Sequence, residues 1–141
     1  MSSVFKVPQK VHHAVLLVAR LAEAYPDGRS VPLAEVAERE NVSQGFLEEI
    51  AGKLRTEGVI AGTRGARGGY VLLHDPREVT VADVVEAVAG PVALTDCLAS
   101  GGCPMSGGCS SEDLWTGVQR KLQKTLADIT IASLARKRAR V

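Results

Sequence analysis

The chain has 141 residues, a formal net charge of +1 and three cysteines, with 45% hydrophobic, 23% charged and 4% aromatic residues. This length fits one ordinary domain or a domain with a short appendage, and the composition excludes a globally disordered chain. A net charge near zero says nothing about nucleic-acid binding, which only local basic clusters can indicate. Because no apolar run has the length of a signal peptide or a membrane span, we expect a cytoplasmic protein.

Helical periodicity predicts three helices in the first sixty residues. The first runs from Lys10 to Ala24, and a short second helix opens at Pro32 and stops near Arg39. After a tight turn, Ser43 is the expected N-cap of the third helix, because its hydroxyl can accept a hydrogen bond from a free amide of the first turn. Gly58 ends that helix. The predicted buried stripe of the third helix is Leu47, Ile50, Ala51 and Leu54.

Two short strands follow, Val59–Ala61 and Tyr70–Leu72, with a glycine-rich basic loop between them. Thr80 and Asp83 form a capping box that starts a valine-rich helix. The chain is then irregular up to Ser110 or Ser111, which caps a long last helix. Thr130 starts a final short turn, and we expect the end, residues 136–140, to be frayed. The apolar positions of the long helix are Leu114, Trp115, Val118, Leu122, Leu126 and Ile129.

This order of elements is typical of a winged helix-turn-helix, so we expect a mainly α fold with a small β-wing, followed by a long C-terminal helix. Residues 1–78 are the predicted DNA-binding domain. Residues 79–141 carry the cysteine loop and the C-terminal helices. Winged helices also serve as protein-binding modules, so a cluster-free interaction module is a second interpretation of the same pattern.

The outer face of the predicted third helix carries side chains suited to a major groove. Gln44 can read adenine, and Glu48 or Glu49 can either accept from a cytosine amino group or simply be solvated. Lys53 and Arg55 are candidates for phosphate contacts. Gly45 and Gly52 on the same face permit a close approach to DNA.

The loop between the strands carries Arg64 and Arg67 among glycines. Glycines let the backbone lie against DNA, and arginine favours a narrow minor groove, although a plain surface turn has a similar composition. Lys10, at the start of the first helix, is a further candidate for a phosphate contact.

The three cysteines, Cys97, Cys103 and Cys109, are separated by five residues each and lie in a glycine-rich segment. A zinc site usually begins with a tight pair of ligands, which is missing here. Thiolates are the standard ligands of iron–sulfur clusters, so we expect such a cluster, with purely thiol-based sensing as the alternative. Three thiolates leave a fourth position open.

The candidates for this fourth ligand are Glu112, His12 and His13. Glu112 also suits a helix N-terminus without any metal, because a carboxylate interacts favourably with the helix dipole. Neighbouring histidines are commonly surface residues, and we expect the same of His74.

These residues together resemble the Rrf-type (IscR/NsrR-like) family of iron–sulfur winged-helix transcriptional regulators, from Lys6 to about Leu134. The specific motifs are Val31-Pro32-Leu33-Ala34, Val42-Ser43 with Phe46-Leu47-Glu48, Lys53-Leu54-Arg55, the wing Arg64-Gly65-Ala66-Arg67-Gly68-Gly69-Tyr70, and the three evenly spaced cysteines. The resemblance implies a homodimer built on the long helix, a palindromic operator and a cluster held by the cysteines. It places DNA contacts at Ser43, Gln44, Phe46, Glu48, Lys53, Arg55, Arg64 and Arg67.

The chain departs from the family at the fourth ligand. Some relatives place a histidine where this chain has Glu112, and others take a carboxylate from the partner's first helix, where this chain has His12. The cluster type, 2Fe-2S or 4Fe-4S, therefore stays open. The expected function is a repressor whose operator binding responds to redox state, nitric oxide or iron–sulfur status. An iron–sulfur carrier is the rival, and no nucleophile–base pair or phosphate loop predicts an enzyme.

Overall fold

The computed structural model describes residues 6–65, 68–94 and 110–139. It confirms a mainly helical fold with a small two-stranded antiparallel sheet. The elements are α1 (Gln9–Ala24), the short 3-10 helix η1 (Tyr25–Asp27), α2 (Leu33–Glu40), α3 (Gln44–Thr56), β1 (Ile60–Gly62), β2 (Tyr70–Leu72), α4 (Val81–Ala89), α6 (Ser110–Asp128) and α7 (Ile131–Ala139).

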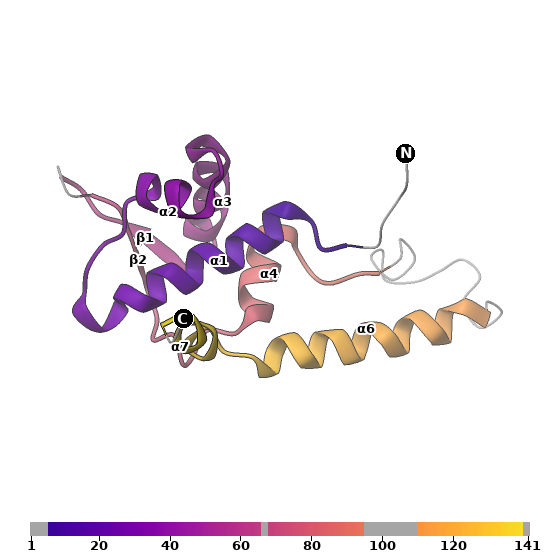
Figure 1. Ribbon diagram of the computed structural model, residues 1–141. Helices are drawn as coiled ribbons and strands as arrows, with labels where there is room; N and C mark the ends of the chain where they lie inside the picture. Colours follow the sequence, from indigo (N-terminus) through magenta and orange to yellow (C-terminus); the bar gives the residue numbers. More distant parts are fainter. Residues whose placement is uncertain (1–5, 66–67, 95–109, 140–141) are drawn as a thin grey trace.

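Helix α1 is the centre of the fold, because α3, α4 and α7 all pack against it (Figure 1). Its inward positions, such as Ala14, Leu17 and Val18, are fully or almost fully buried. Burial of one aliphatic side chain stabilises the folded state by about 1.5–3 kcal/mol, so this aliphatic core compensates for the scarcity of aromatic residues. The core includes residues on both sides of the expected boundary at residue 78, among them Val84 and Ile131.

One prediction for the C-terminus was wrong. The final turn after Thr130 is the nine-residue helix α7, whereas the fraying expected for residues 136–140 stays a prediction. The reason is tertiary packing: Ile131 is fully buried and Ala135 is nearly so, both in the core around α1. Such contacts between distant segments stabilise a helix that its own short sequence would not.

The helix-turn-helix is shaped by two local devices. Asn41 adopts a left-handed conformation with φ of 55°, which ends α2 and turns the chain sharply. The Ser43 Oγ then accepts a hydrogen bond of 3.1 Å from the Phe46 N–H, which confirms the predicted N-cap of α3. The stripe of α3 that was predicted to be buried lies in the core.

The wing is a hairpin whose strands pair Ile60 with Leu72 and Gly62 with Tyr70. Strand β1 begins at Ile60, one residue later than predicted. Val31, just before α2, extends this sheet by an antiparallel bridge, because its N–H and C=O exchange hydrogen bonds of 2.9 Å with Tyr70. The wing is therefore held against the start of α2 as well as by its own strands.

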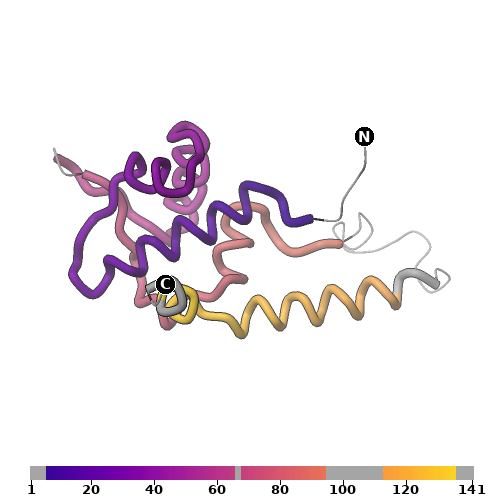
Figure 2. Tube along the Cα trace, viewed as in Figure 1, coloured from indigo at the N-terminus to yellow at the C-terminus, as the bar shows by residue number. Residues whose placement is uncertain are grey.

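Two contacts link the segments that flank α4 to α6 and its C-terminal end. Thr80 and Thr130 form a backbone bridge beside the capping box of α4, which the structure confirms. At the other end, the Leu94 N–H donates to the Gln119 Oε1 over 2.9 Å. Beyond this junction α6 projects from the body, and the wing projects from the opposite end (Figures 1 and 2).

Candidate nucleic-acid interface

An open groove of about 760 Å³ lies between the outer face of α3, the start of α2 and the wing. One wall carries Gln44, Glu48 and Arg55 from α3. The other carries Thr63 and Arg64 from the wing loop, and Pro32–Ala34 form the end. A concave surface with polar side chains on one helix and a basic glycine-rich loop opposite has the components needed to contact a base edge and a phosphate together.

Side chains of the α3 wall are exposed and available to a ligand. Gln44 Nε2 donates a long hydrogen bond of 3.5 Å to Glu48 Oε1, one turn along the helix. This contact orients the Gln44 amide while leaving its carbonyl oxygen as an acceptor. Arg55, in the last turn of α3, and Arg64 are the cations that line the groove.

The backbone of the wing loop is held by hydrogen bonds across the loop and by a close backbone approach at its glycines. Thr63 N–H donates to the Gly69 carbonyl over 2.8 Å, and the Gly69 N–H donates to Thr63 Oγ1 over 2.9 Å. A Cβ on Gly68 would come within 2.7 Å of the Thr63 carbonyl oxygen, so only glycine fits. These contacts hold Arg64 at the edge of the groove. Arg67 lies outside the described residues.

The remaining predicted DNA contacts do not line this groove. Lys53 is exposed on α3 but borders a second hollow, between α3 and α4. Lys10 is exposed near the start of α1. Ser43 serves as the helix cap, and Phe46 is half-buried against the core.

Phe46 has a neighbour that the sequence did not indicate. The His13 ring, from α1, meets the Phe46 ring edge-on, with 5.6 Å between centroids and 82° between planes. The ring centroid of the exposed His12 lies 5.0 Å from that of His13. Burial lowers the pKa of His13 below its ordinary 6.5, and His12 lowers it further while Glu40 raises it. His13 is therefore a partly buried ring packed against Phe46, whereas the exposed His74 is the surface residue that we expected.

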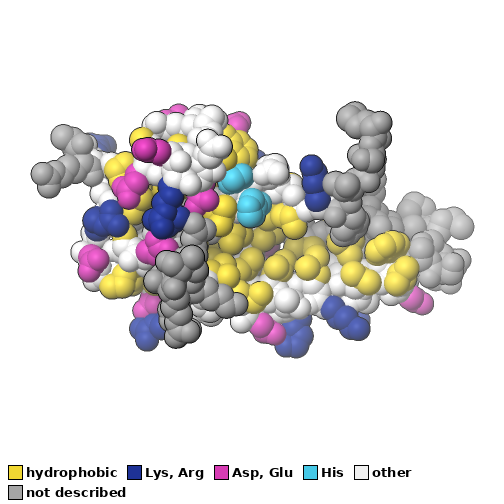
Figure 3. Space-filling view, in the orientation of Figure 1, with side chains coloured by type: hydrophobic (Ala, Val, Ile, Leu, Met, Phe, Trp, Pro, Cys, Tyr) yellow, Lys and Arg dark blue, Asp and Glu magenta, His cyan; other side chains and the backbone are white. Residues whose placement is uncertain are grey.

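Helix α6 exposes a hydrophobic stripe, composed of Leu114, Val118 and Leu122 at intervals of four residues. These side chains are 56%, 41% and 37% exposed, although four-residue spacing on a helix is the usual mark of a buried face. Figure 3 shows hydrophobic side chains gathered in a band along α6, below the two histidines. An exposed apolar stripe of this kind is a candidate contact surface.

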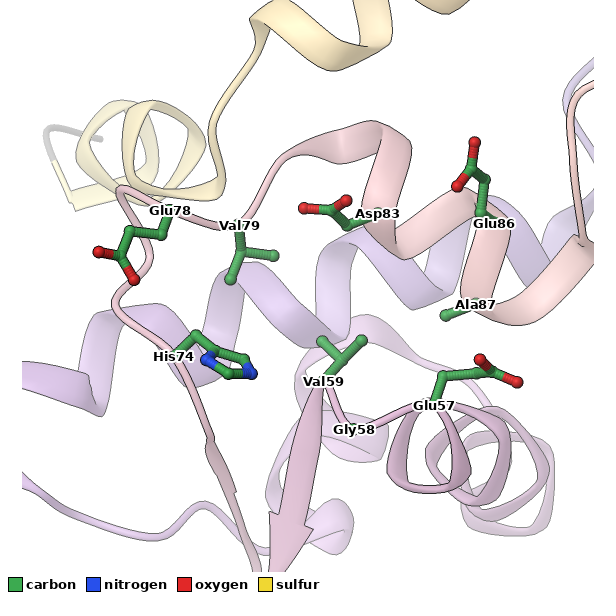
Figure 4. A pocket seen from close by; sticks show the side chains of 9 residues that line it. All are labelled: Glu57, Gly58, Val59, His74, Glu78, Val79, Asp83, Glu86 and Ala87. Atoms are coloured by element: carbon green, nitrogen blue, oxygen red, sulfur yellow. The ribbon is translucent and has the colours of Figure 1, made fainter.

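A further hollow, of about 470 Å³, is strongly acidic (Figure 4). Glu57, Glu78, Asp83 and Glu86 line it together with His74. The carboxylates point in different directions in Figure 4, and Asp83 is already engaged in the capping box of α4. Such a surface repels DNA, whereas the groove between α3 and the wing carries Arg55 and Arg64 and is therefore the better candidate interface.

Most of the metal ligands predicted from the sequence lie outside the residues that the structure describes. Cys97, Cys103 and Cys109 lie outside the described residues. Within the described ranges, no three His, Cys, Asp or Glu residues are grouped so as to hold a metal ion. Glu112 belongs to the first turn of α6. Within the same ranges, no helix combines the length and the apolar character needed to cross a bilayer.

The groove, the wing and the helix-turn-helix define a winged-helix regulator of transcription, not an enzyme. More particularly, the chain belongs to the Rrf2 family, described as iron-dependent transcriptional regulators, whose model matches residues 7–137. It is 36% identical over 121 residues to the HTH-type transcriptional regulators IscR of Cronobacter sakazakii and Escherichia coli, which covers 86% of this chain and 72% of each relative.

Solved structures agree with this assignment. The chain is similar to T. potens IscR, with a TM-score of 0.77 and 27% identity over 94% of this chain and 88% of that one. It is also similar to the oxidized form of Staphylococcus aureus CymR, with a TM-score of 0.74 and 26% identity over 93% of this chain and 96% of that one. The B. subtilis global cysteine regulator CymR shares the fold, with a TM-score of 0.81 at 24% identity over 95% and 98%.

Proposed function

We propose that this chain is a homodimeric repressor that binds a palindromic operator and carries an iron–sulfur cluster on its three cysteines. The observation that carries the DNA-binding part is the groove in which Gln44, Arg55 and Arg64 face one concave surface. A major groove about 12 Å wide admits α3, and the wing then lies along the neighbouring backbone.

The residues of the groove divide into two roles. Gln44 and Glu48 are the proposed readers of base edges, since an amide pairs with adenine and a carboxylate accepts from cytosine. Arg55 and Arg64 are proposed phosphate or minor-groove contacts, together with Lys53, Lys10 and Arg67. Ser43 and Phe46 support α3 from its first turn.

The proposed dimer forms on α6. Its exposed Leu114, Val118 and Leu122 would be buried against the same stripe of a second copy, as a two-fold interface requires. A dimer with two wings reads two half-sites about one helical turn apart, which explains why the operator would be palindromic.

The three thiolates fit an iron–sulfur cluster by their chemistry, because soft sulfur ligands favour iron–sulfur clusters over magnesium or calcium. Cys109 directly precedes Ser110, the first residue of α6. The positive end of the helix dipole favours thiolates there. His12, exposed on α1, and Glu112, in the first turn of α6, remain the proposed candidates for the fourth ligand, and the cluster type is 2Fe-2S or 4Fe-4S.

A bound cluster would supply reactivity toward oxidants or nitric oxide. The chain itself links the cysteine segment to the dimer surface, since Leu94 is hydrogen-bonded to Gln119 and Ser110 begins α6. A change at the cysteines would thus act on the helix that sets the spacing of the two wings. Coupling of this kind typically amounts to about 1–3 kcal/mol. Residues 1–78 are accordingly the proposed reader and residues 79–141 the proposed sensor and dimer unit, acting in the cytoplasm.

A regulator that senses through its thiols, without a cluster, is the second candidate. The structural likeness to Staphylococcus aureus CymR, solved in an oxidized form, favours it, because the same fold accommodates an oxidized state in that protein. An oxidant such as a peroxide would then join two of the three thiols in a disulfide or convert one of them to a sulfenic acid.

One experiment separates the candidates. The protein is purified without oxygen, and iron, acid-labile sulfide and the visible spectrum are measured for the native chain and for Cys103→Ser. Binding to the DNA upstream of its own gene is then compared before and after iron removal. Coloured native protein, colourless variant and a change in affinity support the sensor. Iron-free protein whose DNA affinity follows reversible oxidation supports the thiol regulator, and coloured protein without DNA binding supports an iron–sulfur carrier.

A further inference from the structure

We propose that His13 is a positioning residue for DNA recognition. It acts through its contact with the ring of Phe46, which fixes the position of the first turn of helix α3. The inference rests on the proposed DNA-binding function and assigns part of its selectivity to a residue of α1 that lies outside the groove.

The first step is the geometry of the contact. His13 and Phe46 meet edge-to-face, 5.6 Å apart at 82°, which is the arrangement that aromatic quadrupoles favour. Phe46 lies in the first turn of α3, and its own N–H is held by the Ser43 Oγ. The first turn is therefore fixed from two sides, by the cap on its backbone and by the His13 ring on its side chain.

The second step connects this turn with the groove. Gln44 and Glu48 are two residues before and two residues after Phe46, and both line the groove. Phe46 itself is half-buried and packs on the core, so its ring faces inward. A shift of Phe46 would consequently move both proposed base readers together. Reading a base edge by hydrogen bonds requires correct placement, whereas attraction to phosphates does not.

The third step is that His13 is poorly suited to a purely packing role. Its Nδ1 is buried and has no hydrogen-bond partner in the part of the chain that the structure describes. A buried nitrogen without a hydrogen-bond partner destabilises the folded state. A phenyl ring in place of the imidazole has no such nitrogen and avoids this cost. Stability and positioning can therefore be separated by substitution.

The test compares DNA selectivity with stability in the full-length protein. The probe is a duplex selected from a random library by the native chain, and selectivity is the ratio of its affinity to that of a scrambled duplex at the same salt concentration. His13→Ala is expected to lower selectivity about fivefold to fiftyfold and leave binding to the scrambled duplex within about twofold. His13→Phe keeps a ring, so it should retain native selectivity with an unfolding midpoint no lower than native.

Three further variants test whether the effect passes through this contact. Phe46→Ala should match His13→Ala, and the double variant should lose no more than either single one, because both act through one contact. Ile131→Val, a buried change on α7, should lower stability without changing selectivity.

Native selectivity in His13→Ala, or additive losses in the double variant, would overturn the positioning role while DNA binding itself stands. Failure of the native chain to select any duplex would instead remove the proposed function.

Discussion

Gly69 of the wing lies directly against Val31, so closely that a Cβ on the glycine would overlap the Val31 carbonyl group. This approach is what allows Val31 and Tyr70 to exchange their two hydrogen bonds. The relationship joins the wing to the start of α2, and both border the groove. The wing is thus positioned by a backbone contact that tolerates no side chain.

Gly69→Ala is expected to destabilise the protein by about 1–3 kcal/mol, the usual cost of overpacking. Urea unfolding measures this change. Gly52→Ala is the matched control: nothing lies within 4 Å of an added Cβ there, and alanine in a helix interior is worth about 0.5–1 kcal/mol more than glycine. The argument fails if both variants change stability in the same direction.

Arg20 is the buried charge that joins α1 to the end of α2. It is 5% exposed and donates from Nε and Nη2 to Glu40 Oε1, at 3.3 and 3.2 Å, and from Nη1 to Glu23 Oε2 at 3.1 Å. Arg20→Ala leaves two partly buried carboxylates without this cation. We expect a loss of about 3 kcal/mol, at the low end for buried pairs, since both carboxylates retain some exposure.

Thermal or urea unfolding tests the role of Arg20. The control is Arg39→Ala. Arg39 is exposed, and its Nη1 lies 4.0 Å from Glu23 Oε2, a long distance for an ion pair, so its loss should cost less than about 1 kcal/mol. Equal effects of the two substitutions would show that burial of Arg20 is not what makes its ion pairs important.

The parts of the fold that were predictable from the sequence depend on neighbouring residues. Ser43 with Phe46, and Thr80 with Asp83, are caps that close within three residues, and both were found as predicted. The order of helices and strands followed in the same way from periodicity and from glycine positions.

What the sequence could not supply are contacts between distant segments. The length of α7 depends on the packing of Ile131 in the core around α1. The ring of Phe46 packs against His13, which lies thirty-three residues earlier in the chain. A pair of adjacent histidines carries no local signal that distinguishes an exposed ring from a packed one. Such contacts become visible only when two helices are placed beside one another.

The turn after the wing gives a prediction about acid. The side-chain and backbone hydrogen bonds from Arg77 lower the pKa of Asp75 from 3.8 to about 2. Because the folded pKa lies below the unfolded one, the ionised carboxylate contributes stability that is complete above about pH 4 and is lost as the pH falls toward 2.

An NMR titration of the Asp75 carboxyl carbon should give a midpoint near 2, and Asp75→Asn should flatten the pH dependence of unfolding over this interval. A midpoint close to 3.8 would mean that the pair with Arg77 does not persist in solution.

The basic side of the groove predicts a salt effect. Arg64→Ala and Arg67→Ala should each weaken operator binding and reduce the slope of log affinity against log salt by about one, since each phosphate contact releases about one counterion. Lys124→Ala is the control, because Lys124 pairs with Asp128 on α6, away from the groove. A variant that keeps the native slope removes that arginine from the phosphate contacts.

The exposed stripe of α6 predicts that a single charge substituted into it weakens the proposed dimer. Leu122→Glu places a carboxylate on a stripe that a two-fold dimer would bury twice, and unpaired charges are expensive to bury. We expect dimer affinity to fall at least tenfold, measured by sedimentation equilibrium, with helix content unchanged because Leu122 is not part of the core. Arg120→Glu makes a larger change of charge about 200° around the same helix and should leave the dimer intact. If Leu122→Glu stays dimeric, or if Arg120→Glu dissociates equally, the copies associate through another face, and the spacing of the two wings is not set by α6.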